Sequence, residues 1–263
     1  MFVHPQFDPV AFSAGPLSIR WYGLAYLLGF ALFWLLGRYR ARQAWRGISI
    51  ESVEDLLFYG MLGVIVGGRL GFCFFYQPQW FLTHPSDILK VWQGGMSAHG
   101  GMLGVIAAMA FYEVKTRTGF LRVADFAVPL VPLGLFFGRI GNFINGELWG
   151  RACDSSLPWA MIFPQSGTLI ARHPSQLYEA LGEGLLLFIL LWVYSAKPRK
   201  TGSVAALFCV GYATARFIVE FFREPDAYLG LGLLGLSRGQ WLTLPILGVG
   251  LGLFWISRQK RPS

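Results

Sequence analysis

One segment of the chain gathers polar side chains at the end of an apolar stretch. It reads Gly138-Arg-Ile-Gly-Asn-Phe-Ile-Asn-Gly-Glu-Leu-Trp-Gly-Arg151 and holds two arginines, two asparagines and one glutamate. Guanidinium groups bind anions through a planar fork of N–H donors, and clustered arginines are the usual way to hold a phosphate. The glycines allow close approach of backbone and ligand, where a Cβ would stand in the way.

Two further side chains could take part in chemistry. His99 lies in Gly94-Gly-Met-Ser-Ala-His-Gly-Gly101, and its apolar neighbours offer nothing local to hydrogen-bond. An imidazole titrates near neutrality and therefore suits proton transfer, although a lone histidine in a membrane protein can equally serve helix packing. Tyr22 either positions a substrate or is an ordinary aromatic residue at a membrane interface.

Ionisable residues also share helical faces. Tyr212, Arg216, Glu220 and Arg223 follow one another at i, i+4, i+8 and i+11, which places them on one side of a helix. Two interpretations remain open for such residues. They could be ion pairs that lock helices together, or they could bind an anionic headgroup. The four arginines at positions 69, 139, 216 and 223 favour the second interpretation.

The elements that must position these residues are membrane helices. Of 263 residues, 54% are hydrophobic and 14% charged, and the mean hydropathy is +0.50. The hydrophobic stretches are long enough to cross the roughly 30 Å hydrocarbon core of a bilayer. The sequence predicts an all-α polytopic membrane protein with about seven spans, near 19–37, 55–76, 97–114, 124–142, 176–194, 203–222 and 240–257.

The placement of basic residues predicts the orientation of the chain. The net charge is +8, which alone could suggest a nucleic-acid partner. However, thirteen lysines and arginines follow spans 1, 3, 5 and 7, whereas the alternate connections hold five. By the positive-inside rule, the N-terminus is outside, the C-terminus is cytoplasmic, and no nucleic acid is expected.

We expect one transmembrane domain over residues 1–263. Residues 1–18 should form an arm on the outer face, with outer connections at about 77–96, 143–175 and 224–239. Gly63, Gly67 and Gly71 make two overlapping GxxxG steps and predict a close helix contact. The three cysteines show neither disulfide-type nor metal-type spacing, so no metal site is expected.

This topology brings the candidate residues to one depth. It places Arg69 in the outer half of its span, and Tyr22, His99, Arg139 and Arg216 at the outer ends of theirs. Elements far apart in the sequence thus deliver ionisable groups near the outer headgroup boundary. Intramembrane charges are costly and are functional candidates by default. An anionic lipid headgroup is therefore the expected ligand.

The motifs together resemble those of the bacterial prolipoprotein diacylglyceryl transferase family. The resemblance covers essentially the whole chain. Besides residues 138–150, it is carried by Trp21-Tyr-Gly23, Gly67-Gly-Arg69, Gly94-Gly-Met-Ser-Ala-His-Gly-Gly101, Arg172-His-Pro-Ser-Gln-Leu-Tyr-Glu179 and Arg216-Phe-Ile-Val-Glu-Phe-Phe-Arg-Glu-Pro-Asp226. Nothing is carried over for residues 151–171, where family members vary in length.

The resemblance implies a multi-pass enzyme of the bacterial inner membrane with its active site towards the outer leaflet. It would transfer the sn-1,2-diacylglyceryl group of phosphatidylglycerol to the lipobox cysteine of a prolipoprotein. The products would be a thioether and glycerol 1-phosphate, in the first step of lipoprotein maturation. Matching positions imply roles for Tyr22, His99, Arg139, Asn142, Glu147, Gly150, Arg216 and Glu220.

The chemistry assigns tasks to these residues. We expect Tyr22, His99, Arg139 and Arg216 in catalysis, with His99 as base for the thiol. An arginine–carboxylate pair is the alternative base. Substrate binding is expected from Arg139, Asn142, Asn145, Glu147, Gly150, Glu220, Arg223 and Arg69. Neither a metal nor an organic cofactor is required, because the phosphoglycerol of the donor is already a leaving group.

Three alternative functions fit the sequence less well. A different phospholipid-headgroup transferase usually carries several acidic residues at helical spacing for a metal, and none are visible. A transporter or channel for an anionic metabolite predicts charges through the whole membrane depth and internal symmetry. A non-catalytic scaffold leaves His99 and the glycines of the 138–151 segment without a task.

Overall fold

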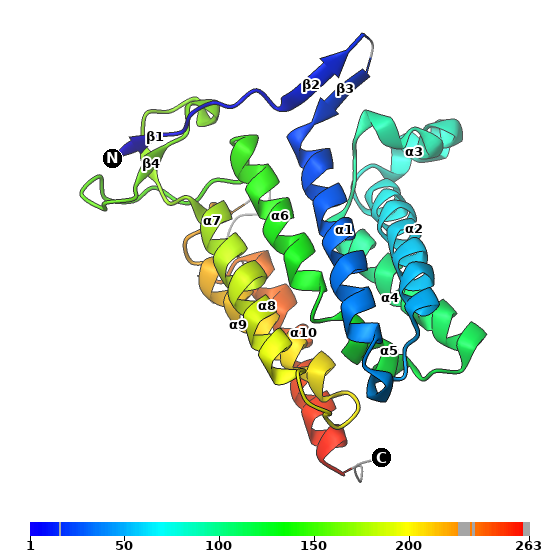
Figure 1. Cartoon of the computed structure of the whole chain (residues 1–263). Coiled ribbons are helices and arrows are strands. Elements are labelled where there is room, and N and C mark those ends of the chain that lie inside the picture. Colours follow the sequence, from blue (N-terminus) through cyan, green and yellow to red (C-terminus); the bar gives the residue numbers. More distant parts are fainter. Residues whose placement is uncertain (16, 226–231, 233–234, 260–263) are drawn as a thin grey trace. The chain divides into compact units, whose positions relative to one another are not determined.

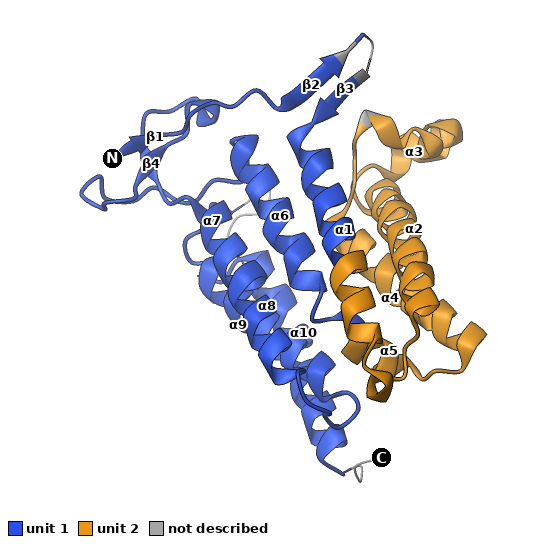
Figure 2. Ribbon diagram, in the orientation of Figure 1, with its two compact units in different colours: residues 1–33, 127–263 blue, residues 34–126 orange. Residues whose placement is uncertain are grey.

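The computed structural model describes residues 1–15, 17–225, 232 and 235–259 (Figure 1). The chain divides into two compact units (Figure 2). We call residues 1–33 with 127–263 the first unit, and residues 34–126 the second unit. The expectation of a single transmembrane domain over residues 1–263 stays a prediction.

The second unit is helical. Helix α1 (Trp21–Ala41) enters it from the first unit and is followed by α2 (Ile50–Phe75), α3 (Pro78–Thr83), α4 (Ala98–Thr116) and α5 (Phe120–Ala127). Short 3₁₀ turns lie at Ala44–Arg46, Pro85–Leu89 and Val91–Gln93. Helix α4 begins where Ser97 supplies an N-cap, since the Ser97 hydroxyl accepts the Gly100 N–H at 3.2 Å.

Helices α2 and α4 pack backbone against backbone through glycines. A Cβ added to Gly63 would lie 2.5 Å from the Gly104 carbonyl oxygen, and one added to Gly71 would lie 2.8 Å from the Gly100 Cα. Such an approach is possible only for residues without a side chain. The predicted GxxxG contact is therefore confirmed, with Gly100 and Gly104 as its counterpart on α4.

The first unit holds most of the remaining helices. They are α6 (Val131–Ile144), α7 (Ser175–Glu179), η5 (Ala180–Leu186), α8 (Leu187–Tyr194), α9 (Ser203–Val219) and α10 (Arg238–Gln259). Segments α7, η5 and α8 form one continuous helix in which η5 is π-helical. Its inner face joins α9 in an apolar core around Leu187, Leu191 and Val204.

The span predicted at 124–142 is not one straight helix. Helix α5 ends at Ala127 and α6 begins at Val131, because Pro129 lies within the break and Pro132 follows in the first turn of α6. Proline lacks an N–H donor and disfavours helical geometry at the residue before it. Pro132 itself is tolerated in the first turn of α6.

Short strands modify the all-α expectation. Strand β1 (Phe2–Val3) pairs in parallel with β4 (Met161–Ile162), which pairs antiparallel with β5 (Ala171–Arg172). A separate hairpin joins β2 (Val10–Ala14) to β3 (Leu17–Arg20), which leads directly into α1 (Figure 1). These strands lie in and next to the predicted 1–18 arm and in the predicted 143–175 connection. No local sequence pattern predicted that they would pair.

A buried histidine ties the N-terminal arm to α6. The His4 Nε2–H donates to the Phe143 carbonyl at 2.7 Å, while its Nδ1 accepts the Gln6 N–H at 3.1 Å. The ring also stacks on Phe163 with centroids 5.3 Å apart. The arm is thereby fixed beside the loop that carries the candidate residues.

Four helical segments are long and apolar enough to cross a membrane: α1, α2, residues 175–194 and α10. A fifth is added if α5 and α6 count as one broken span, and α9 is a shorter apolar helix. The described part of the chain is thus a mostly helical protein with four or five candidate membrane spans. Half of the predicted 224–239 connection, residues 226–231 and 233–234, lies outside the described residues.

Candidate functional site

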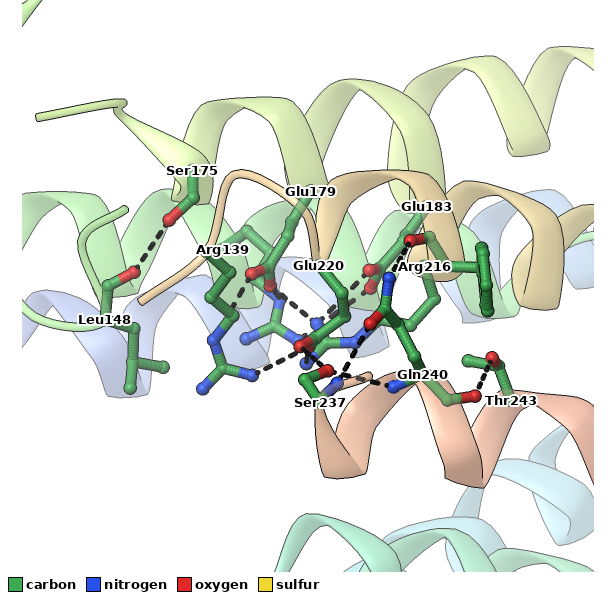
Figure 3. Close-up of polar contacts among 12 residues, drawn as sticks. Arg139, Leu148, Ser175, Glu179, Glu183, Arg216, Glu220, Ser237, Gln240 and Thr243 are labelled. Carbon is green, nitrogen blue, oxygen red and sulfur yellow. Dashed lines mark hydrogen bonds and ion pairs between the residues drawn. The ribbon is translucent and has the colours of Figure 1, made fainter. Parts of the chain in front are cut away.

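Six charged side chains of the first unit form one network, which we call the ion-pair cluster (Figure 3). They come from α6, from the α7–η5 helix, and from α9 with the two turns that follow it. Three arginines alternate in space with three glutamates, so their formal charges balance. The members are Arg139, Glu179, Glu183, Arg216, Glu220 and Arg223.

Arg216 is the centre of the cluster. Its Nη2 lies 2.6 Å from Glu220 Oε1, which realises the predicted i,i+4 pair. Its Nη1 lies 3.1 Å from Glu179 Oε2 and 3.3 Å from Glu183 Oε1. Since the side chains of both Glu179 and Glu183 are at most 1% exposed, Arg216 neutralises charge that water cannot reach. The helix-locking interpretation therefore has support at Arg216.

Arg139 is the most exposed member of the cluster. Its Nε lies 2.5 Å from Glu179 Oε2, and its Nη1 donates to Asn142 Oδ1 at 3.3 Å. Its side chain is 21% exposed, against 11% for Arg216. Its Nη2 also faces Glu183 Oε2 at 3.8 Å, which is beyond hydrogen-bond distance. Among the described residues, N–H donors therefore remain on both terminal nitrogens of Arg139. Arg139 is thus anchored by two carboxylates and can bind an anion through the donors that remain.

Close helix contacts place these charges. A Cβ on Gly184 would lie 2.6 Å from Phe136 Cβ, so the π-helical segment lies directly against α6 one turn before Arg139. Immediately before α10, the Ser237 hydroxyl donates to Glu220 Oε2 at 2.6 Å. π-Helical turns occur often at functional sites. Here the turn presents Glu179 and Glu183 to the same arginines.

The loop after α6 is held in an unusual backbone conformation. Gly146 and Leu148 both have positive φ, at 63° and 57°. Asn142 Nδ2 donates to Glu147 Oε1 at 2.8 Å, and Asn145 Nδ2 approaches the same oxygen at 3.4 Å. Left-handed geometry costs free energy at a non-glycine residue such as Leu148. The strained residue Leu148 thus directly follows the point where the side chains of Asn142, Asn145 and Glu147 meet.

Tyr22 lies against the same segment. A Cβ on Gly141 would lie 2.8 Å from Tyr22 Cδ2, so the tyrosine ring rests on the glycine surface of α6. Its hydroxyl lies 3.3 Å from that of Tyr26, and the charges of Arg139 and Glu147 are near enough to act on it. The structure therefore places Tyr22 beside Gly141 and near Arg139 and Glu147.

Gly150 has a packing role in the structure. Its N–H donates to the His173 carbonyl at 2.8 Å, and a Cβ would lie 2.5 Å from the carbonyl oxygens of both His173 and Phe222. This contact uses the Gly150 N–H, and the expected role of Gly150 in substrate binding stays a prediction. The next residue, Arg151, also contacts the segment after α9, since its Nε donates to the Arg223 carbonyl at 2.9 Å.

Arg69 and His99 belong to the second unit, where Arg69 has a structural task. Its Nε and both terminal nitrogens donate to the carbonyls of Asp87, Ile88, Gly94 and Gly95 at 2.5–3.1 Å. Four of its five N–H donors are thereby used, which argues against the expected contact with a substrate phosphate. The exposed His99 lies in the first turn of α4 and has no recorded partner among the described residues of its unit.

Sequence reasoning undervalued the carboxylates of the α7–η5 helix. The spacing of Gln176, Glu179 and Glu183 in the sequence places them on one helical face, but the predicted site residues did not include them. Two glutamates one turn apart inside an apolar helix were the available signal, because buried carboxylates need cationic partners. Ser237 gave no such signal, since its contact with Glu220 depends on the packing of α10.

The glycines of α6 allow a stability test of this geometry. We expect Gly141→Ala to lower the stability of the protein by about 1–3 kcal/mol, because the new methyl group overlaps the Tyr22 ring. Gly138→Ala is the matched control on the same helix, since nothing lies within 4 Å of its added Cβ. Thermal unfolding in detergent compares the two variants. Equal melting temperatures would contradict the placement of Tyr22.

Comparisons with known proteins identify the family of the chain. A family model described as prolipoprotein diacylglyceryl transferase matches residues 9–256. The phosphatidylglycerol–prolipoprotein diacylglyceryl transferase of Nitrosomonas europaea is 59% identical over 261 residues, covering 98% of this chain and 93% of that protein. The enzyme of the same name from Methylobacillus flagellatus is 58% identical, covering 99% and 100%. That from Paracidovorax citrulli is 54% identical and covers both chains fully. The chain belongs to the prolipoprotein diacylglyceryl transferase family.

Proposed function

We propose that this chain is an enzyme that transfers the sn-1,2-diacylglyceryl group of phosphatidylglycerol to the lipobox cysteine thiol of a prolipoprotein. Family membership supports the transferase activity, and the names of the relatives state both substrates. The structural observation that carries the proposal is Arg139, held by Glu179 and Asn142 but still partly exposed. An anchored guanidinium with remaining donors suits a lipid phosphate.

The reaction exchanges one bond to carbon for another. The cysteine thiolate attacks the glyceryl carbon that bears the phosphate, a C–S bond forms, and the C–O bond to phosphate breaks. The leaving group is glycerol 1-phosphate, so a phosphodiester with one negative charge becomes a monoester that gains a second. Catalysis therefore needs a base for the thiol proton and cationic donors at the phosphate.

Arg139 binds the phosphate directly in this proposal, and Arg216 supports it from deeper in the cluster. Fixed N–H donors aimed at growing charge stabilise a transition state without reorganisation. Glu179 and Glu220 hold the two arginines in place at 2.5 and 2.6 Å. Because the cluster is formally neutral, the phosphate gains directed hydrogen bonds rather than attraction to a large net charge.

The residues beside Arg139 bind the rest of the donor. Glu147 is exposed yet held by Asn142 and Asn145, which suits hydrogen bonds to the glycerol hydroxyls. Tyr22 lies against this segment and positions the headgroup or the thiol. Arg223, which approaches Glu179 and Glu220, completes the arginine set that we assign to the phosphate side.

The base for the thiol is His99 in this proposal. Its exposure at the start of α4 leaves the ring accessible, and imidazole suits proton transfer at neutral pH. An arginine–carboxylate pair of the ion-pair cluster is the alternative. Burial raises the pKa of the Cys153 thiol in the outer connection, which disfavours its thiolate.

The proposal also includes the number of membrane spans and the orientation of the chain. Seven spans, an outer N-terminus and a cytoplasmic C-terminus follow from the charge asymmetry of the connections. That arrangement brings Arg139, Arg216 and Tyr22 near the outer headgroup boundary of the bacterial inner membrane. Phosphatidylglycerol reaches this depth from the surrounding lipid, and a secreted prolipoprotein presents its cysteine there.

Transfer activity is the first test. Purified protein in phosphatidylglycerol-containing micelles should add one diacylglyceryl mass to a peptide with an intact lipobox cysteine. A peptide whose cysteine is replaced by serine should stay unmodified, because a hydroxyl is a far weaker nucleophile than a thiolate. Mass spectrometry reads both. An unchanged cysteine peptide in the presence of phosphatidylglycerol would overturn the transferase proposal.

Arg139 is tested by two substitutions. We expect Arg139→Ala to abolish turnover and Arg139→Lys to lower kcat/KM by about 10²-fold or more, because a lysine keeps the charge but loses the planar fork. Both variants should still purify as monodisperse protein. Arg42→Lys, at an exposed position outside the cluster, is the control and should keep full activity. A fully active Arg139→Ala protein would exclude the phosphate role.

His99 is tested by His99→Gln. As the base it contributes roughly 10²–10⁴-fold, so kcat should fall by about that factor. Near-normal turnover would remove His99 as base and favour the arginine–carboxylate pair.

A further inference from the structure

Gln176 supports the loop that carries the headgroup-binding residues. It lies in the first turn of α7 and is only 1% exposed. Its Nε2 donates to the Glu147 carbonyl at 2.6 Å. Figure 3 shows the neighbouring contact, in which the Ser175 hydroxyl donates to the Leu148 carbonyl at 3.0 Å. Two consecutive side chains thus hold the strained part of the loop.

The other end of the Gln176 amide has no partner. Its Oε1 is buried and accepts no hydrogen bond from any described residue. The amide cannot be turned round, because the Glu147 carbonyl only accepts and must face the nitrogen. An unpaired buried acceptor costs free energy, and such a group in a native protein needs an explanation.

The side-chain oxygen of Asn145 is a second buried acceptor without a hydrogen-bond partner among the described residues. Asn145 directs its Nδ2 to the Glu147 carboxylate. Glu147 therefore accepts one hydrogen bond from the Asn145 amide at its carboxylate and another from the Gln176 amide at its backbone carbonyl. Each of these amides leaves one oxygen that can accept a hydrogen bond.

We propose that Gln176 is a specificity-determining residue, whose Oε1 accepts a hydrogen bond from a hydroxyl of the glycerol headgroup. This rests on the proposed function and extends headgroup recognition to the α7 helix. The glycerol headgroup carries two hydroxyls, and the two amide oxygens of Gln176 and Asn145 match them in number and polarity. A site built for a hydroxyl rejects the analogue that lacks it, because its own polar group then stays unpaired.

Headgroup analogues test the proposal. The donors are phosphatidylglycerol and two analogues in which the headgroup is a propanediol ester with a single hydroxyl, at either position. All three yield the same thioether peptide, so one mass measurement serves for all. The wild-type enzyme should prefer phosphatidylglycerol to at least one analogue by about tenfold or more in kcat/KM.

Variants at position 176 separate recognition from support. In Gln176→Met the preference against that analogue should fall to within about threefold, because the acceptor is gone. Gln176→Asn, which withdraws the amide oxygen, should have the same effect and serves if the first variant folds poorly. Ser175→Ala is the matched control: it weakens the same loop but removes no acceptor, so it should change the three donors equally.

Two outcomes overturn the proposal. One is a wild-type enzyme that uses all three donors equally. The other is a Gln176→Met enzyme that loses activity on all donors by one factor and keeps the wild-type preference, which would make Gln176 a support of the loop only. Failure of the proposed function is distinct, since the wild-type enzyme would then transfer nothing from phosphatidylglycerol.

Discussion

Buried charge has to be paired, and this constraint organises the first unit. Glu179 and Glu183 are almost fully buried, so the arginines of α6 and α9 must reach them. Removing one partner of such a pair costs about 3–5 kcal/mol, because the other charge stays buried and uncompensated. The cluster thereby fixes α6, the α7–η5 helix and α9 in one arrangement.

The same pairing prepares the chemistry. A guanidinium that is already held by carboxylates does not have to be ordered when a phosphate arrives. Arg216 is committed to three glutamates, whereas Arg139 stays partly exposed. The interpretation as helix-locking ion pairs and the interpretation as a phosphate site therefore complement each other: locking makes Arg139 a fixed donor. The strained loop at Leu148 adds the headgroup-binding side chains beside it.

Local patterns predicted much of this arrangement. Apolar stretches predicted a helix in each expected region, the GxxxG steps predicted the α2–α4 contact, and helical spacing predicted the Arg216–Glu220 pair. Features that depend on distant chain segments were not predictable. The β1–β4 pairing joins residues far apart in the sequence, and the carbonyl contacts of Arg69 come from a loop whose shape no periodicity reveals. The break before α6 could have been predicted from Pro129 and Pro132.

The position of a bound phosphate tests the central claim most directly. It can be measured in an experimental structure of the enzyme with phosphatidylglycerol in lipid nanodiscs. The account predicts a phosphate oxygen within hydrogen-bond distance of the terminal nitrogens of Arg139, about 2.7–3.2 Å, with the contact between Arg139 Nε and Glu179 kept. A phosphate bound away from Arg139, with the ion-pair cluster unchanged, would contradict it and leave the cluster a purely structural role.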